Sequence, residues 1–359
     1  MKRNLLLTVD HEIFGNGTGD VRQHVTGPTE RMCRIAERFE IPITIFFEAE
    51  EYAQFERNAA ELRRFFGYDP AREMRQQAQD LSRRGHDIQL HLHPQWYKAE
   101  RINGSWSLQD DHLTVDALFE TVDETVEYIG RRRAALEEVT GTPVIAYRAG
   151  GFAAQPGQRL LKALAENGFK IESSVVKGMH RPRPHPIDYR ATPIQRRYWR
   201  VSDEVSEEDP SGSLWEIPVY STMGRRFQQL TFSRLKAKFS RNVPKERQRE
   251  MIQELGVGRN PASLLSFLGS SVPIKLDFHN LTPTALIRMI KHASPAPQGD
   301  KDVLVLIGHS KEHINDLAFE EMLRRVAADP SLEVITMRAL AALLGEPAAK
   351  HNGAKRARV

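Results

Sequence analysis

The sequence predicts an α/β protein in which parallel strands alternate with helices that pack outside them. Short apolar runs, typical of buried strands, alternate repeatedly with amphipathic stretches of helical length along the 359 residues. About seven or eight such runs occur, which is enough to close a barrel. Polar residues capable of chemistry directly follow several of these runs. Because the carboxyl ends of barrel strands form the active face, this placement also favours a barrel.

The predicted elements follow one another in a regular order. Strands are predicted where short apolar runs occur, at 5–9, 41–47, 85–93, 143–147, 214–219, 272–278, 303–307 and 332–336. Helices are predicted where apolar residues recur at helical spacing, at 28–39, 51–66, 70–84, 114–140, 157–167, 282–292, 316–328 and 339–344. A glycine-rich loop at 14–20 matches no dinucleotide or nucleoside-triphosphate fingerprint, which disfavours those ligands.

We expect residues 1–345 to form one domain with two insertions. The segment 178–213 is rich in proline, arginine and acidic residues, and 222–270 is basic and irregular, so both are predicted to interrupt the alternation. Residues 346–359 are small, polar and basic, and a disordered tail is predicted there.

Composition excludes several classes of protein. Cys33 is the single cysteine, so no intramolecular disulfide can form. The sequence shows neither a signal peptide nor an apolar run of membrane-spanning length, and we expect a cytoplasmic protein. The net charge of +4 comes partly from basic runs at 131–133, 234–249 and 355–358. No nucleic-acid module accompanies them, so no nucleic-acid partner is expected, whereas peripheral contact with an anionic membrane is an alternative role.

Two histidines stand at the end of the third predicted strand, in His91-Leu92-His93-Pro94. Side chains two residues apart in a strand point the same way, so His91 and His93 are expected to face one side together. Two neutral imidazoles that converge at a strand end suit a divalent ion such as Zn²⁺. The alternative is that they are two polar side chains beside a turn.

Two carboxylates follow the first predicted strand. Asp10 and Glu12 are two residues apart, so they also share a side of an extended segment. A catalytic zinc site usually has three protein ligands, and His91, His93 and one carboxylate meet that count. The other carboxylate is then free to act as a general base. Alternatively, both carboxylates cap the following loop.

An arginine and a further histidine follow two later strands. Arg148 follows the strand at 143–147 and His309 follows the strand at 303–307. Arg148 can pair with the base and keep its pKa low, and His309 can protonate a leaving group. Together with Asp10, these residues predict metal-assisted hydrolysis of an amide or ester, although either could instead make a structural contact.

Other residues have competing interpretations. Glu216 lies between apolar neighbours, so a buried structural role is favoured over substrate binding. Trp96 lies in the loop after the two histidines and is a candidate to stack on a sugar ring. Asp277 and His279 form a competing metal pair, and His11 reaches the site only if the chain bends there.

Five motifs occur in the same order as in the polysaccharide deacetylases with the NodB homology domain (carbohydrate esterase family 4 and relatives), which this sequence resembles. The motifs are Leu-Leu-Thr-Val-Asp10-His-Glu12, Gly-His-Asp-Ile-Gln-Leu-His91-Leu-His93-Pro, Tyr-Arg148-Ala-Gly-Gly, Trp-Glu216-Ile-Pro and Ile-Gly-His309-Ser. The resemblance spans about residues 4 to 312, with long unfamiliar segments between the motifs.

The resemblance implies a distorted (β/α)7-type barrel, a divalent metal that is usually zinc, and removal of an acyl group from a sugar. The first aspartate of the family's first motif falls on Asp10, which implies the catalytic base. The arginine motif falls on Arg148, which would orient that base. The last motif falls on His309, which implies the general acid.

Two departures from the family pattern affect the ligands. The family's second aspartate, a metal ligand, falls on His11, and Glu12 is preferred instead because it shares the side of Asp10. The usual pair of histidines four residues apart is absent. His91 and His93 are expected to replace it, with His91 the safer of the two.

The sequence therefore predicts a metal-dependent hydrolase that removes an N-acyl group, with acetyl expected, from a sugar. The divergent motifs are similar to those of cytoplasmic relatives linked to biosynthesis of surface polysaccharide, such as the O-antigen of lipopolysaccharide. The partner would be an acylated sugar or glycan precursor. One alternative is a catalytically silent carbohydrate-binding or assembly protein of the same pathway. Another is a barrel hydrolase that acts on a different sugar-linked bond, for example a glycosidic bond.

Overall fold

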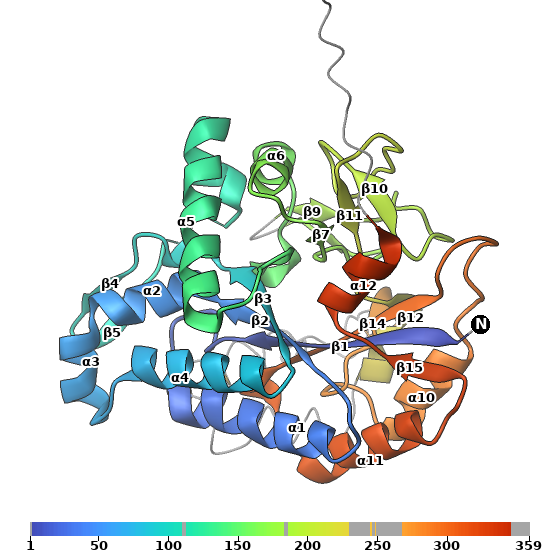
Figure 1. Cartoon of the computed structure of the whole chain (residues 1–359), viewed down its shortest axis with the longest axis horizontal. Helices are drawn as coiled ribbons and strands as arrows, with labels where there is room; N and C mark the ends of the chain where they lie inside the picture. Colours follow the sequence, from blue (N-terminus) through green and yellow to red (C-terminus); the bar gives the residue numbers. More distant parts are fainter. Residues whose placement is uncertain are drawn as a thin grey trace, which may run out of the picture.

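The computed structural model describes residues 2–109, 113–182, 186–229 and 268–345, together with Lys245 and Gln248. Seven parallel strands form the main path of its nine-stranded sheet and follow the order of the chain; Figure 1 shows their arrangement. They are β1 (Arg3–His11), β2 (Thr44–Glu48), β3 (Asp87–Leu92), β6 (Ala146–Ala149), β7 (Ile171–Glu172), β11 (Leu214–Glu216) and β14 (Val303–His309). Six of these strands form one continuous parallel series from β1 to β11, and β14 pairs with β1 on its other side.

The sheet closes into a barrel through the residues that follow β11. Val219 forms parallel bridges with both Val176 and Val305, and the backbone N–H of Tyr220 donates to the carbonyl oxygen of Val305 at 3.1 Å. The closure is narrow because β10 (Trp199–Val201) pairs antiparallel with β11 and occupies much of its edge. The predicted distorted (β/α)7-type barrel is therefore confirmed, and β10 is one source of the distortion.

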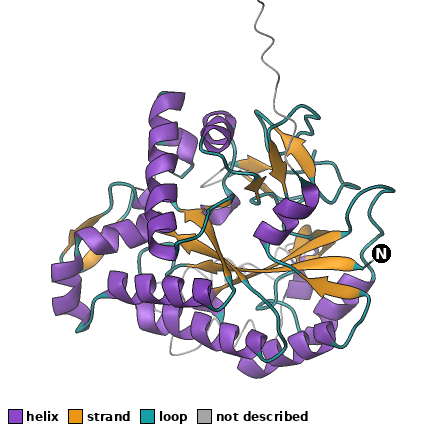
Figure 2. Ribbon diagram, in the orientation of Figure 1, coloured by secondary structure: helices purple, strands orange, loops and turns teal. Residues whose placement is uncertain are grey.

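Helices cover the outside of the sheet (Figure 2). The main ones are α1 (Gly27–Glu37), α4 (Pro70–Arg83), α5 (Val122–Thr140), α6 (Gln158–Glu166), α10 (Pro283–Lys291) and α11 (Asp316–Ala327). Two shorter helices, α2 (Ala49–Arg57) and α3 (Ala59–Phe66), follow β2, and α12 (Met337–Leu344) ends the described chain. The N–H groups of Met337 and Arg338 donate to Thr44 and Asp87, so α12 lies at the amino ends of β2 and β3.

The helix predicted at 114–140 is shorter in the structure. Residues Val115–Ala117 form a separate 3-10 turn, and α5 begins only at Val122. The reason is a capping box: the Thr121 hydroxyl accepts the N–H of Glu124, and the Glu124 carboxylate accepts the N–H of Thr121. This signal marks a helix start that apolar spacing alone did not reveal.

The segment 178–213, predicted as an inserted loop, contains three short strands, which are β8 (His180–Arg181), β9 (Ile187–Asp188) and β10. The strand predicted at 272–278 is β13 (Ser271–Lys275), which pairs antiparallel with β12 (Ser221–Arg225). Asp277, just after β13, forms a parallel bridge with Ile307 of β14. Two hairpin strands, β4 (Glu100–Ile102) and β5 (Ser105–Ser107), follow β3, and β15 (Leu332–Val334) pairs with β1.

Most of the predicted insertion at 222–270 lies outside the described residues, as do nearly all of the basic segment 234–249 and the tail 346–359. Among the helices that the structure describes, none is both long enough and apolar enough to cross a membrane.

Candidate active site

The register of the parallel strands brings the predicted site residues to one end of the barrel. Asp10 on β1 pairs with His309 on β14, and Glu48 on β2 pairs with His91 on β3. His91 in turn pairs with Arg148 on β6. Each of these residues ends or nearly ends its strand, so five strands deliver polar side chains to the carboxyl face of the barrel.

Asp10 is held by a buried arginine. The Arg148 Nη1 group donates to Oδ1 of Asp10 at 2.7 Å and to Oγ1 of Thr8 at 3.0 Å, and Nε donates to the carbonyl oxygen of Ser173 at 3.0 Å. The guanidinium lies 4.0 Å from the centre of the Phe46 ring. Burial opposes ionisation of Asp10, but the Arg148 guanidinium keeps the pKa of this carboxyl below its usual value. Asp10 is therefore a fixed, ionised carboxylate whose Oδ2 is turned away from the arginine.

His309 faces that second oxygen. Its Nε2 lies 3.6 Å from Oδ2 of Asp10, and its Nδ1 lies 3.5 Å from Oε2 of Glu312. Burial opposes protonation of His309, but Glu312 and Asp10 raise its pKa above the usual value. Its side chain is 15% exposed, compared with 4% for Asp10 and 1% for His91. The imidazole of His309 thus lies nearer to solvent than Asp10 and His91 do, opposite the Asp10 carboxylate.

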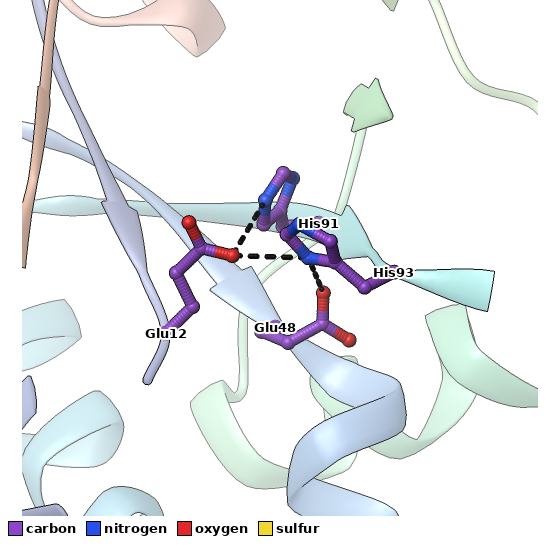
Figure 3. Close-up of side chains that lie close together, drawn as sticks. All are labelled: Glu12, Glu48, His91 and His93. Carbon is purple, nitrogen blue, oxygen red and sulfur yellow. Dashed lines mark hydrogen bonds and ion pairs between the residues drawn. The ribbon is translucent and has the colours of Figure 1, made fainter. Parts of the chain in front are cut away.

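Four buried side chains lie beside this pair and converge on one point (Figure 3). Oε2 of Glu12 lies 2.9 Å from Nδ1 of His93 and 3.4 Å from Nε2 of His91. Oε2 of Glu48 lies 2.8 Å from the same Nδ1 of His93. Each residue offers one ligand atom, and all four atoms lie within 4.8 Å of one another. Two imidazole nitrogens and two carboxylate oxygens form a donor set that suits zinc or another divalent transition metal.

The hydrogen bonding of the His91 ring supports a role for this residue as a metal ligand. Its Nδ1 lies 2.8 Å from the carbonyl oxygen of Arg148 and donates to it, so in the neutral ring the lone pair is on Nε2. This Nε2 is buried and has no hydrogen-bond partner among the described residues. A buried lone pair without a donor is costly, and metal-ligating histidines characteristically donate their other ring nitrogen in this way.

One member of the cluster, Glu48, and one residue bonded to it, Lys311, were missed in the sequence. Glu48 also caps α2, since its Oε1 accepts the N–H groups of Glu50 and Glu51. In the sequence, Glu48 could have been recognised by its position at the end of a predicted strand, which Asp10 and His91 share. Lys311 lies two residues after His309 and donates to Oε1 of Glu12 at 2.7 Å. No feature of the neighbouring sequence distinguishes Lys311 from a lysine on the protein surface.

The cluster is charged even without a metal. Burial opposes protonation of His93, but the carboxylates of Glu12 and Glu48 raise its pKa to about 10. Burial also opposes ionisation of Glu12, yet His93 and Lys311 hold its pKa well below the usual value. Glu51 differs, because burial and the nearby carboxylates of Glu48 and Glu12 raise its pKa well above the usual value.

We expect the metal-free protein to lose stability as the pH rises from about 6.5 to about 10. A histidine whose folded pKa lies above its unfolded value stabilises the fold fully below the unfolded pKa, and this contribution disappears as the pH passes through the folded pKa. Urea unfolding across this window measures the effect. His93→Gln should remove the extra loss, whereas His180→Gln, at an exposed histidine, should retain it. Equal pH dependence in the native and His93→Gln proteins would contradict the assignment.

Several candidate residues do not join the cluster. Trp96 is 1% exposed and packs edge-on against Phe55 and Trp106, so the structure does not present its ring to a substrate. Glu216 is fully buried and accepts the N–H of Val175 at 3.1 Å, which fits the structural role favoured for it.

The alternative ligands are not part of this group of four, and Asp277 lies in a separate group of candidate ligands with His309 and Glu312. His11 stacks on Phe47 and its Nε2 lies 2.9 Å from Oε1 of Gln77, so it turns away from the cluster. Oδ1 of Asp277 accepts the N–H groups of His279 and Asn280, which shows that a turn replaces the extended segment predicted there.

No protein-family model matches the sequence, and no curated protein matches it either. Among solved structures, a Mycobacterium smegmatis protein assigned as a polysaccharide deacetylase is similar over 95% of this chain and 90% of its own, with 17% identity and a TM-score of 0.48. A family 4 carbohydrate esterase from Streptomyces lividans is similar over 97% of both chains, with 9% identity and a TM-score of 0.41. The fold is similar to that of polysaccharide deacetylases.

A 4-alpha-glucanotransferase from Thermococcus litoralis is also similar, over 95% of this chain and 40% of its own, with 13% identity and a TM-score of 0.45. Similarity at this level concerns the fold and does not establish an activity.

A cavity of about 1100 Å³ lies apart from the cluster, beside β12 and the start of β14. Lys177, Arg197 and Tyr220 are among its lining residues, and none of the cluster residues lines it. Its cationic groups are engaged: Lys177 donates to the carbonyl oxygen of Pro193, and Arg197 pairs with Asp302. Asp10, His309 and the candidate ligands thus lie elsewhere in the barrel.

Proposed function

We propose that this protein is a metal-dependent hydrolase that removes an N-acyl group, with acetyl expected, from a sugar. One observation carries the proposal: Oδ2 of the arginine-held Asp10 faces Nε2 of His309 at 3.6 Å, directly beside a buried group of four metal-ligand candidates. Hydrolysis of an amide needs a base for the attacking water and an acid for the departing amine, and this arrangement offers both.

In the proposed mechanism, Asp10 accepts a proton from the attacking water at Oδ2, because Oδ1 is occupied by Arg148. Arg148 keeps the carboxylate ionised and fixes its orientation through Thr8 and Ser173. His309 donates a proton from Nε2 to the departing amine. Its more exposed position places it toward the side from which a substrate enters.

The ligands proposed for the divalent ion are Glu12, His91 and His93, and Glu48 adds a fourth candidate oxygen. When bound, the ion would polarise the acyl carbonyl and make water more acidic. Glu48 is held by the N–H groups at the start of α2, so its orientation is fixed before any ion binds. The Arg148 carbonyl similarly fixes the ring of His91.

The substrate class rests on the sequence motifs, which resemble those of enzymes that deacylate sugars. A role in biosynthesis of a surface polysaccharide, in the cytoplasm, belongs to the same proposal and has the same support. Candidate substrates are therefore N-acetylated sugars carried as nucleotide- or lipid-linked glycan precursors.

We expect the zinc-loaded protein to release acetate from at least one member of a panel of such N-acetylated sugars. Acetate measured by an enzyme-coupled assay is the readout, and the metal-free protein is the control. Release that requires the metal would support the proposal. Absence of release across nucleotide-linked, lipid-linked and free sugars, with the metal bound, would contradict it.

A second candidate function is a catalytically silent carbohydrate-binding or assembly protein. It is favoured by the charge balance within the cluster, since Glu12 contacts Lys311 at 2.7 Å and His93 at 2.9 Å without any metal. Such a cluster can hold its own structure as an ion-pair network. Failure of the purified protein to bind a divalent ion would favour this function.

A further inference from the structure

The two oxygens of Glu12 have different surroundings. Oε2 faces the histidines, at 2.9 Å from Nδ1 of His93 and 3.4 Å from Nε2 of His91. Oε1 faces the other way and accepts a hydrogen bond from Nζ of Lys311 at 2.7 Å. One oxygen of this carboxylate therefore points at the candidate metal position, and the other is already bound to a cation.

The side chain of Lys311 is held in place by more than one contact. Its Nζ also donates to the carbonyl oxygen of Ile13 at 3.1 Å, and its side chain is 13% exposed. The neighbouring Ser310 hydroxyl lies 3.3 Å from the N–H of Glu12 and 3.2 Å from its carbonyl oxygen. The segment that carries Lys311 is thus hydrogen-bonded to the segment that carries Glu12. The contact between the two side chains is therefore fixed by the backbone around it.

A carboxylate can bind a divalent ion through one oxygen or through both. An ammonium on Oε1 leaves Oε2 as the single oxygen of Glu12 that can serve as a ligand. We infer that Lys311 is a positioning residue that confines Glu12 to one-oxygen coordination and thereby keeps a coordination position open for substrate. This inference rests on the proposed function, because it concerns the same ligand group.

The same contact disfavours one kind of two-ion site. Asp10, Glu12 and His309 form a second group whose ligand atoms lie within 4.8 Å of one another. Glu12 belongs to both groups, and a bridge between two ions through both of its oxygens would need Oε1 for one of them. Lys311 already donates to Oε1. The lysine therefore disfavours two ions bridged in this way.

The test uses Co²⁺ as the probe, bound to the full-length native protein, Lys311→Met and Lys311→Gln. Without the ammonium, Glu12 can bind through both oxygens and the site becomes more negative. We expect Co²⁺ to bind about tenfold more tightly in both variants, in competition with a chelator. The visible absorption per cobalt should weaken, as coordination number rises. Lys291→Met, which removes a lysine from an exposed ion pair with Asp329, should leave both readouts unchanged.

The sign of the affinity change separates this role from a structural one. If Lys311 only supported the fold, both variants would bind Co²⁺ more weakly and unfold at lower temperature, and the inference would be overturned. An unchanged spectrum in folded Lys311→Gln would overturn it as well. If the native protein bound no Co²⁺, the proposed function itself would fail, which is a distinguishable result.

Discussion

Asp10→Asn is expected to lower kcat by about a thousandfold on any N-acetylated sugar that the native protein deacylates. The amide keeps the shape of the side chain and still offers an oxygen to Arg148, but it cannot accept a proton from water. Since Oδ2 of Asp10 lies 3.6 Å from His309 and Oδ1 is bound to Arg148, no other described carboxylate occupies this position. The measurement is acetate release by native and variant proteins at equal metal content.

The fold of this variant needs a separate control. Arg148 is completely buried, and removal of its partner charge leaves an uncompensated guanidinium, which typically costs about 3–5 kcal/mol. Thr8→Val provides a matched variant, because it removes another hydrogen-bond partner of Arg148 and leaves the Asp10 charge intact. We expect Thr8→Val to lower stability while retaining most of the activity.

The outcomes separate chemistry from folding. An Asp10→Asn protein that is folded, binds the metal and is inactive would support the assignment of Asp10 as the base. Near-native activity in that protein would show that another group takes the proton. A loss of activity in Thr8→Val as large as that in Asp10→Asn would attribute both losses to displacement of Arg148.

Much of this site follows from rules that apply to any parallel barrel. Asp10, His91, Arg148 and His309 lie at the ends of four different strands, and Glu12 follows the same strand as Asp10. Parallel strands bring their carboxyl ends to one face. The alternation of side chains along a strand then predicts that His91 and His93 face Glu12 and not the helices. The sequence motifs identified Asp10, Arg148 and His309 independently of the geometry.

The rest depends on contacts that no local pattern contains. Glu48 resembles a helix cap, and only the register that pairs it with His91 shows that it also reaches the cluster. Lys311 reaches Glu12 because the turn after β14 is bonded to the end of β1, across about 300 residues of sequence. Trp96 is buried because Gln54 on α2 donates to its carbonyl oxygen and the loop turns inward. Long-range packing decided each of these three cases.

We expect the native protein, purified without a chelator or a polyhistidine tag, to contain about one zinc ion per chain, and His91→Ala/His93→Ala to contain none. The double substitution removes both nitrogens of the ligand group and leaves Glu12 and Glu48, which alone are poor zinc ligands. Binding to the folded state should also raise the unfolding temperature of the native protein when zinc is added, and this shift should vanish in the variant.

Gly150 provides a milder test of the same site. A β-carbon at this position would clash with the imidazole ring of His93, whereas one at Gly15 would meet nothing within 4 Å. Gly150→Ala should therefore displace His93 and weaken zinc binding by roughly 10- to 100-fold, and Gly15→Ala should leave it unchanged. Equal zinc content in the native protein and His91→Ala/His93→Ala would place the metal elsewhere. A native protein that stays free of zinc after zinc is added back would instead favour the silent carbohydrate-binding function, because the charges of the cluster are already paired within the chain.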